Sequence, residues 1–198
     1  MKRPNAEALV APPWQLSEDT FNRFLETGYL IYKDQVRVTF SYPHMQADIL
    51  QLLKMAKGIV LPDAEDLLES IEQNRSIVGL DLNDQIIAHQ RFKLWPSVKL
   101  AELRTAFVRP DHRGIGLNTF MDKVILNLIH LQHPLWEALG YCQPLSMSKN
   151  IYSKLGFDEV SLDFVKGQWP IMDIDCPKSN CYLKNGHACG CQVLHLQF

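Results

Sequence analysis

The chain has 198 residues and a formal net charge of −2 at pH 7. This length fits one domain with a buried core, and the scattered basic residues form no stripe that would bind nucleic acid. No run approaches the ~18 apolar residues that span a bilayer, and the start, MKRPNAEALVAPPWQ, lacks the apolar stretch of a secretory signal. We therefore expect a cytoplasmic protein without nucleic-acid or membrane partners.

The chain opens with an arm and one short helix. Residues 1–16 contain several prolines and no periodicity. Ser17 can cap a helix with acidic residues in its first turn, and Gly28 ends that helix. We expect 1–34 to form an N-terminal arm and helix, and 35–198 to form the main domain.

The following segments alternate between strand and helix patterns. β-Branched and aromatic residues predict strands, apolar residues on one helical face predict helices, and Asn83-Asp84 predicts a hairpin turn. In order, we expect strands at 29–32 and 35–40, helices at 44–56 and 63–73, and hairpin strands at 76–82 and 85–95.

The central stretch, from Glu102 to Leu128, changes from a strand to a helix at a glycine-rich turn. Pro110 removes a backbone donor and ends the strand. The turn is Arg113-Gly114-Ile115-Gly116, and from Leu117 the apolar residues fall on one helical face. A strand, a glycine turn and a helix N-terminus can together bind phosphate, through free N–H groups and the positive end of the helix dipole.

The rest of the chain predicts further strands around one short helix. A buried strand is expected at 134–141, and a helix at 146–157 is stopped by Gly156. The remainder, 158–198, has the pattern of strand pieces, with a hairpin signal at Asn185-Gly186.

Two motifs resemble those of the GNAT superfamily of N-acetyltransferases. Val108-x-Pro110-x-x-Arg113-Gly114-x-Gly116 resembles the family's acyl-CoA pyrophosphate loop, R/Q-x-x-G-x-G/A, with Asn118 in place of the last small residue. Tyr152-Ser153-Lys154-Leu155-Gly156-Phe157 resembles the end of the family's A-x-x-x-Y-x-x-x-G-F helix. Ser148 stands at the position of that alanine. Leu145 replaces an asparagine often found three residues earlier, so that residue's contact to pantetheine is not carried over.

The resemblance implies a fold, a co-substrate and a reaction. The fold is the α/β (α+β) acyl-CoA N-acyltransferase fold, a mixed and mostly antiparallel central sheet flanked by helices. The reaction moves an acetyl group from acetyl-CoA to a primary amine of a small molecule or a peptide, by direct transfer in a ternary complex. The implied cofactor-binding residues are Phe107, Val108, Arg113, Gly114, Ile115, Gly116, Leu117 and Asn118.

The same resemblance suggests an acid and a base. Tyr152 matches the tyrosine that protonates or hydrogen-bonds the departing CoA sulfur, and this is the role we favour. The alternative is an aromatic residue that packs beside Leu155 and Phe157. Glu102 is the candidate base: it precedes Val108 by six residues, so regular alternation would place both on one face of the strand. His89 on the preceding strand is the rival base, since an unperturbed pKa near ~6.5 suits proton abstraction.

A cysteine-rich tail covers about 176–198. Its four thiols, with His187, lie close together in the sequence, but their spacing is irregular for a zinc site, and we do not favour a metal. The alternative is small buried residues on paired strands. The candidate zinc ligands are Cys176, Cys181, Cys189 and Cys191.

Two further readings stay open. The chain could be a non-catalytic acyl-CoA-binding or regulatory module on the same fold, which Asn118 and Leu145 would favour, or an interaction domain stabilised by metal at the cysteine tail.

An amine acceptor should lie between the helix pair at 44–73 and the strands after 158. A homodimer is also left open.

Overall fold

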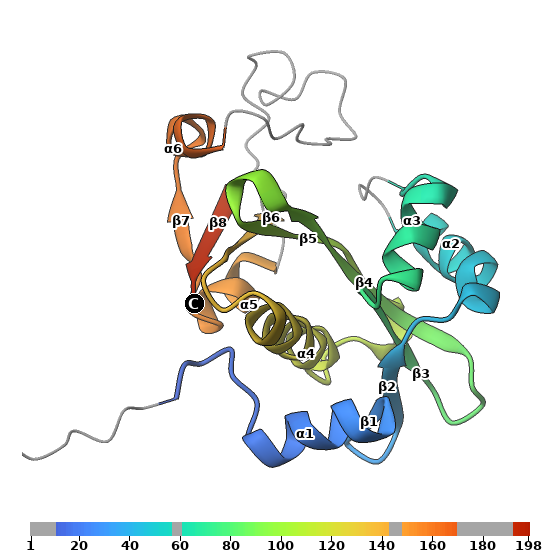
Figure 1. The fold of residues 1–198 in the computed structure, drawn as a ribbon. Helices are drawn as coiled ribbons and strands as arrows, with labels where there is room; N and C mark the ends of the chain where they lie inside the picture. Colours follow the sequence, from blue (N-terminus) through green and yellow to red (C-terminus); the bar gives the residue numbers. More distant parts are fainter. Residues whose placement is uncertain (1–10, 57–60, 143–147, 170–191) are drawn as a thin grey trace, which may run out of the picture.

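The computed structural model describes residues 11–56, 61–142, 148–169 and 192–198. These residues build an eight-stranded sheet in the order β1-β2-β3-β4-β5-β6-β8-β7. All neighbouring strands are antiparallel except β5 and β6, which are parallel. The expected mixed, mostly antiparallel sheet with flanking helices is therefore confirmed (Figure 1).

The first half of the chain follows the expected order. Ser17 caps α1 by accepting a hydrogen bond from the Thr20 amide, and Gly28 ends the helix in a left-handed conformation. Asp63 caps α3 in the same way, through the Glu65 amide. The elements are α1 (Glu18–Thr27), β1 (Tyr29–Tyr32), β2 (Val36–Phe40), α2 (Gln46–Lys54), α3 (Ala64–Glu72), β3 (Ser76–Leu80) and β4 (Ile86–Trp95).

The second half holds the parallel step of the sheet and one unexpected helix. The elements are β5 (Leu100–Val108), α4 (Leu117–Gln132), β6 (Glu137–Cys142), α5 (Ser148–Lys154), β7 (Asp158–Val160), α6 (Leu162–Gln168) and β8 (Gln192–Gln197). The expectation of strand pieces missed α6. Ser161 caps this helix by accepting from the Phe164 amide, and Val165 and Trp169, one turn apart, are buried beside Leu100. The hairpin expected at Asn185-Gly186 lies outside the described residues.

The helices divide between the two faces of the sheet. α1, α4 and α5 cover one face, and α2 and α3 cover the other near β3 and β4 (Figure 1). The first face holds the largest core cluster, to which α1 contributes Phe24 and β1 contributes Leu30. The segment before residue 35 therefore shares its core with the main domain.

Candidate functional site

The glycine turn before α4 adopts positive φ angles, which residues with a Cβ atom rarely adopt. Gly114 and Gly116 have φ of +83° and +86°, in the left-handed region that favours glycine. The Tyr32 hydroxyl donates to the Ile115 carbonyl at 2.8 Å, and a Cβ added to Gly116 would lie 2.9 Å from that hydroxyl oxygen. Tyr32 thus holds the turn in place from strand β1, and Gly116 leaves room for it.

The N-terminus of α4 has neither a side-chain cap nor an acidic residue in its first turn within the described chain. A side chain caps α1 and α3, and α2, which also lacks a side-chain cap, has Asp48 in its first turn. The first amides of α4 are therefore open to an anionic ligand, at the positive end of the helix dipole. Leu117 is buried, so only its backbone can contact such a ligand.

Asn118 turns its side chain into the protein. Its Nδ2 donates to Asp122 Oδ2 at 3.1 Å, one helical turn further on. The other carboxylate oxygen, Oδ1, accepts a hydrogen bond from Gln90 Nε2 on β4. Asp122 is completely buried, and this burial raises its pKa to about 7 although the Gln90 hydrogen bond acts in the opposite direction. The bulk of Asn118 is thereby held by a buried carboxylate, while its backbone amide stays at the helix N-terminus.

Arg113 connects the glycine turn to the end of strand β5. Its Nε donates to the Val108 carbonyl at 3.0 Å, and its guanidinium lies 5.4 Å from the centre of the Phe107 ring. The Arg109 amide donates to the Ile87 carbonyl. Because antiparallel hydrogen bonding alternates along a strand, the backbone groups of Val108 then point to the opposite edge of β5, away from β4.

A bulge in β5 lies just after the last residue that pairs with β6. His89 pairs with Phe107 and Arg91 with Arg104, so Thr105 and Ala106 together face Gln90. Thr105 has φ of +47°, unusual for a β-branched residue. The pairing of β5 with β6 covers Leu100–Glu102 and Glu137–Leu139. Beyond that point the described residues of the two strands are no longer paired with each other.

The bulge also corrects the orientation of Glu102. Val108 is opposite Ala88 and Glu102 is opposite Lys93. Those partners are separated by an odd number of residues on β4, so Glu102 and Val108 lie on opposite faces of the sheet. The prediction that both share a face was wrong because regular alternation ignores the extra residue of a bulge. Phe107, not Val108, shares the face of Glu102.

Glu102 is buried and already has partners. Its Oε2 accepts hydrogen bonds from Trp95 Nε1 and Arg104 Nη2, both at 2.9 Å. The Glu102 residue is 3% exposed. Its orientation is therefore fixed by the protein before any substrate binds.

Tyr152 lies beside β6, near the point where β5 and β6 cease to pair. Its ring packs on Gly140, where an added Cβ would come within 3.1 Å of it, and lies 5.1 Å from the Phe157 ring. Gly140 follows Leu139, the last β6 residue paired with β5, and alternation turns it to the face opposite Glu102. Tyr152 and Glu102 therefore flank the point of separation from opposite faces.

His89 is buried beside two serines. Its Nε2 lies 3.0 Å from Ser76 Oγ, which in turn lies 2.7 Å from Ser41 Oγ. Burial, with a smaller contribution from the charge of Arg91, lowers the pKa of His89 to about 3. The imidazole is neutral and weakly basic at pH 7, which argues for a structural role rather than for proton abstraction.

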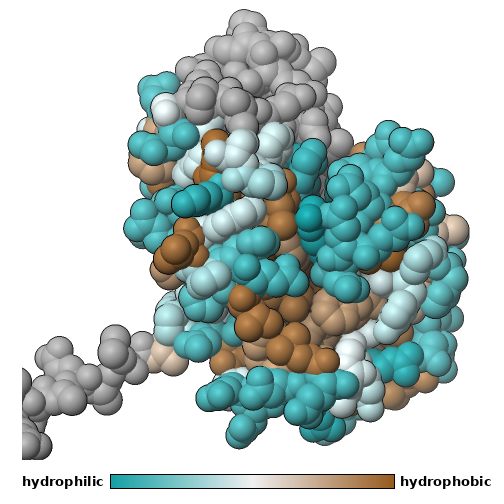
Figure 2. Space-filling view, viewed as in Figure 1, coloured by the Kyte–Doolittle hydropathy of each residue, from teal (hydrophilic) through white to brown (hydrophobic). Residues whose placement is uncertain are grey.

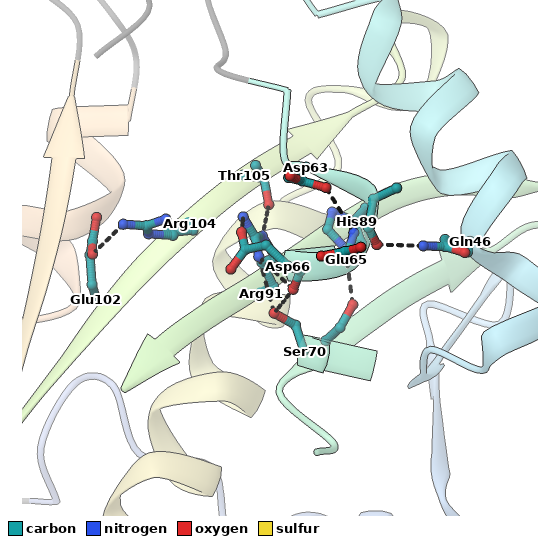
Figure 3. A network of polar contacts seen from close by, with 12 residues as sticks. Gln46, Asp63, Glu65, Asp66, Ser70, His89, Arg91, Glu102, Arg104 and Thr105 are labelled. Carbon is teal, nitrogen blue, oxygen red and sulfur yellow. Dashed lines mark hydrogen bonds and ion pairs between the residues drawn. The ribbon is translucent and has the colours of Figure 1, made fainter. Parts of the chain in front are cut away.

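Arg91 ties the bulge to α3 on the face of α2 and α3. Its Nη2 lies 2.6 Å from Asp66 Oδ2, its Nη1 donates to Ser70 Oγ at 3.0 Å, and its Nε donates to Thr105 Oγ1 at 3.2 Å (Figure 3). Burial acts to raise the pKa of Asp66, but the hydrogen bond and charge of Arg91 outweigh it and lower that pKa. Figure 2 shows a furrow between the lobe of α2 and α3 and the remainder of the molecule, with apolar side chains along part of its floor.

The residues that support the site were not predictable from the sequence. Three of them, Tyr32, Gln90 and Arg91, are distant in sequence from the two motifs and belong to no motif themselves.

Two other expectations bear on metals and membranes. The four tail cysteines lie outside the described residues, and within the described ranges no cluster of three or more His, Cys, Asp or Glu is placed to hold a metal ion. Among the helices that the structure describes, none is long and apolar enough to cross a membrane.

Comparison with solved structures shows the fold. No protein-family model and no curated protein sequence matches the chain. The Mycobacterium tuberculosis protein Rv2747, solved with CoA and NLQ, superposes with a TM-score of 0.61 at 19% identity, covering 81% of this chain and 98% of that one. Arabidopsis thaliana Naa50, bound to the bisubstrate analogue CoA-Ac-MVNAL, gives 0.59 at 15% identity, covering 82% and 99%.

A third structure leads to the same fold. The ribosomal-protein-S18-alanine N-acetyltransferase of Escherichia coli gives a TM-score of 0.59 at 12% identity, covering 82% of this chain and 93% of that one. An acetyltransferase from Staphylococcus aureus that superposes similarly is described as a member of the GNAT family. The chain has the GNAT acetyltransferase fold.

Proposed function

We propose that this protein is an acetyl-CoA-dependent N-acetyltransferase that acts on a primary amine by direct transfer in a ternary complex. The observation that carries the proposal is the open N-terminus of α4, which follows two left-handed glycines beside the separated edge of β5. Two solved structures of the same fold contain CoA or a CoA conjugate. The fold alone would not establish an activity, so the proposal rests on these residues as well.

The turn and the strand would hold the two ends of the co-substrate. The amides from Ile115 to Asn118 bind the pyrophosphate, with Arg113 and the two glycines setting their direction. The Val108 N–H, which points to the separated edge of β5, donates to the pantetheine arm or the thioester carbonyl. Acetyl-CoA supplies the activated acetyl group.

Glu102 and Tyr152 would move the protons. Glu102, directly or through a water, takes a proton from the ammonium group, and the free amine then attacks the thioester carbonyl. As the C–S bond breaks, Tyr152 gives its phenolic proton to the sulfur. The acylated nitrogen loses its second proton to the tyrosine oxygen, and the proton on Glu102 passes to solvent. Such a positioned acid or base contributes ~10²–10⁴ in rate.

The acceptor would enter from the face of α2 and α3. Glu102 and Phe107 share that face, and the furrow of Figure 2 runs beside the lobe of these helices. In Naa50 the bisubstrate analogue carries the MVNAL group. A small molecule and a peptide therefore both remain suitable acceptors for the first screen.

An amine screen with two variants tests the mechanism. CoA release is followed with amino acids, polyamines and peptides, and Tyr152→Phe and Glu102→Gln are then compared with the wild type on the best acceptor. We expect each variant to lower kcat by about 10²-fold or more. Unchanged turnover in both would contradict the assigned roles. Acetyl-CoA binding without turnover of any amine would favour the non-catalytic binding module.

A further inference from the structure

The N-terminus of α4 is joined to strand β4 by three polar side chains. Asn118 Nδ2 donates to one oxygen of Asp122 at 3.1 Å, and Gln90 Nε2 donates to the other oxygen. Asn118 is the second residue of α4, within the turn whose amides are open. Gln90 lies on β4, directly across from the bulge at Thr105 and Ala106. The carboxylate therefore connects the anion-binding turn to the strand that faces the bulge.

This arrangement costs folding energy. Asp122 and Gln90 are fully buried, and Gln90 Oε1 is a buried oxygen without a hydrogen-bond partner among the described residues. Burial also raises the pKa of Asp122 to about 7. An apolar residue at position 122 would avoid the cost of burying the carboxyl group, because its neighbours in the core, Met121 and Val124, are apolar. A buried polar residue that lowers stability in this way is expected where it contributes to a functional site.

We propose that Asp122 is a positioning residue for the cofactor: it fixes, through Asn118, the direction of the first amides of α4, with Gln90 as its anchor on the sheet. Binding of a pyrophosphate depends on several N–H groups converging on it, so a small rotation of the first turn weakens all of those contacts together. The inference rests on the proposed binding of acetyl-CoA and adds a role for a residue that does not touch it.

The test compares Asp122 with a buried polar residue of the same helix. Asn127 is 7% exposed and donates to the Trp14 carbonyl at 3.2 Å, more than one turn further from the glycine turn. Asp122→Ala, Asn118→Ala, their double variant and Asn127→Ala are compared by calorimetric titration with acetyl-CoA and by thermal melting. Asn118→Ala leaves the buried carboxylate in place, so it remains informative should Asp122→Ala fold poorly.

We expect Asp122→Ala to weaken acetyl-CoA binding by about tenfold and Asn118→Ala by severalfold. The double variant should be no weaker than Asp122→Ala, since both act through one connection. Asn127→Ala should melt earlier and keep wild-type affinity. Acetylpantetheine, which lacks the pyrophosphate, should bind wild type and Asp122→Ala equally by ligand-observed NMR.

Three results would overturn the inference. The first is wild-type affinity in both Asp122→Ala and Asn118→Ala. The second is a loss in Asn127→Ala as large as in Asp122→Ala, because destabilisation alone would then explain it. The third is an equal loss for acetylpantetheine. Failure of the wild type to bind acetyl-CoA would instead reject the proposed function itself, and this inference with it.

Discussion

Single residues decide whether the glycine turn can receive an anion. Asn118 replaces a small residue of the family loop, and bulk at that position would be expected to obstruct phosphate. The structure shows that its side chain is engaged by Asp122, so the substitution leaves the backbone amide in place. Gly116 is required for two reasons, its positive φ and the nearness of Tyr32, whereas Gly114 is required only for its φ.

The two glycines should therefore differ in their effect on binding. Gly114→Ala and Gly116→Ala each place a side chain at positive φ, at a cost of roughly 1–2 kcal/mol in the free energy of unfolding. Only Gly116→Ala also pushes the Tyr32 ring from the Ile115 carbonyl. Calorimetric titration should show a larger loss of acetyl-CoA affinity for Gly116→Ala. Equal losses would contradict the role of Tyr32 in holding the turn.

His89 should make the protein sensitive to acid. Its pKa is about 3 in the folded protein and about 6.5 when unfolded, so between these values the unfolded state binds the extra proton and stability falls as the pH falls. At pH 4.5 this lowers the free energy of unfolding by up to about 3 kcal/mol relative to pH 7.5. Urea denaturation of His89→Gln should show a correspondingly smaller change between the two pH values.

An exposed histidine provides the control for this effect. His44 is exposed on the turn before α2, so His44→Gln should retain the wild-type pH dependence. A His89→Gln variant with the same acid sensitivity as the wild type would show that the imidazole is not held neutral by burial.

At the scale of elements, two adjacent β4 residues support the bulge from opposite faces. Gln90 reaches Asp122 on α4, and Arg91 reaches Asp66 on α3 as well as Thr105 in the bulge. The bulge turns Glu102 away from the face of Val108, and the pairing of β5 with β6 ends just before it. Both partners of the bulge lie far from it in sequence, so alternation along β5 alone could not predict it.

The Arg91 pair should matter more than an exposed ion pair. Arg91 is 2% exposed, so Asp66→Asn would leave a buried guanidinium without its counter-charge. Because the Asp66 side chain is itself 31% exposed, we expect a cost of roughly 1–3 kcal/mol. Asp84→Asn removes the partner of Arg37 in a pair whose side chains are 43% and 74% exposed, and should cost less than about 1 kcal/mol. Urea denaturation at two salt concentrations measures both. Similar costs would indicate that Ser70 and Thr105 suffice to hold Arg91.

Across the whole molecule, the sequence predicts best where local chemistry decides the structure. The caps at Ser17 and Asp63, the β3–β4 hairpin and the glycine turn all follow from residues near one another, and all are present. Helix α6 was missed because its apolar residue Val165 and the following Trp169 are recognisable as one face only once β5 and β6 lie beside them. The family resemblance implied a mixed sheet, but it did not indicate that β5 and β6 form the parallel pair.

The candidate site was predictable only in part. Both motifs lie where β5 and β6 cease to pair. The motifs themselves could be found from the sequence, because they place glycine, proline and tyrosine at fixed spacings. The orientation of Glu102 and the residues that brace the turn depend on contacts between distant strands and helices. The roles of Glu102 and Tyr152 stay predictions that kinetics must test.

Calorimetric titration of acetyl-CoA into the wild type, Gly116→Trp and Leu135→Trp tests the central claim most directly. Leu135 is 84% exposed, so its variant controls for an added tryptophan. We predict saturable binding near one molecule per chain in the wild type and in Leu135→Trp, and none in a Gly116→Trp protein that retains its circular dichroism spectrum. Absence of binding to the wild type, or undiminished binding to Gly116→Trp, would contradict a cofactor site at the N-terminus of α4.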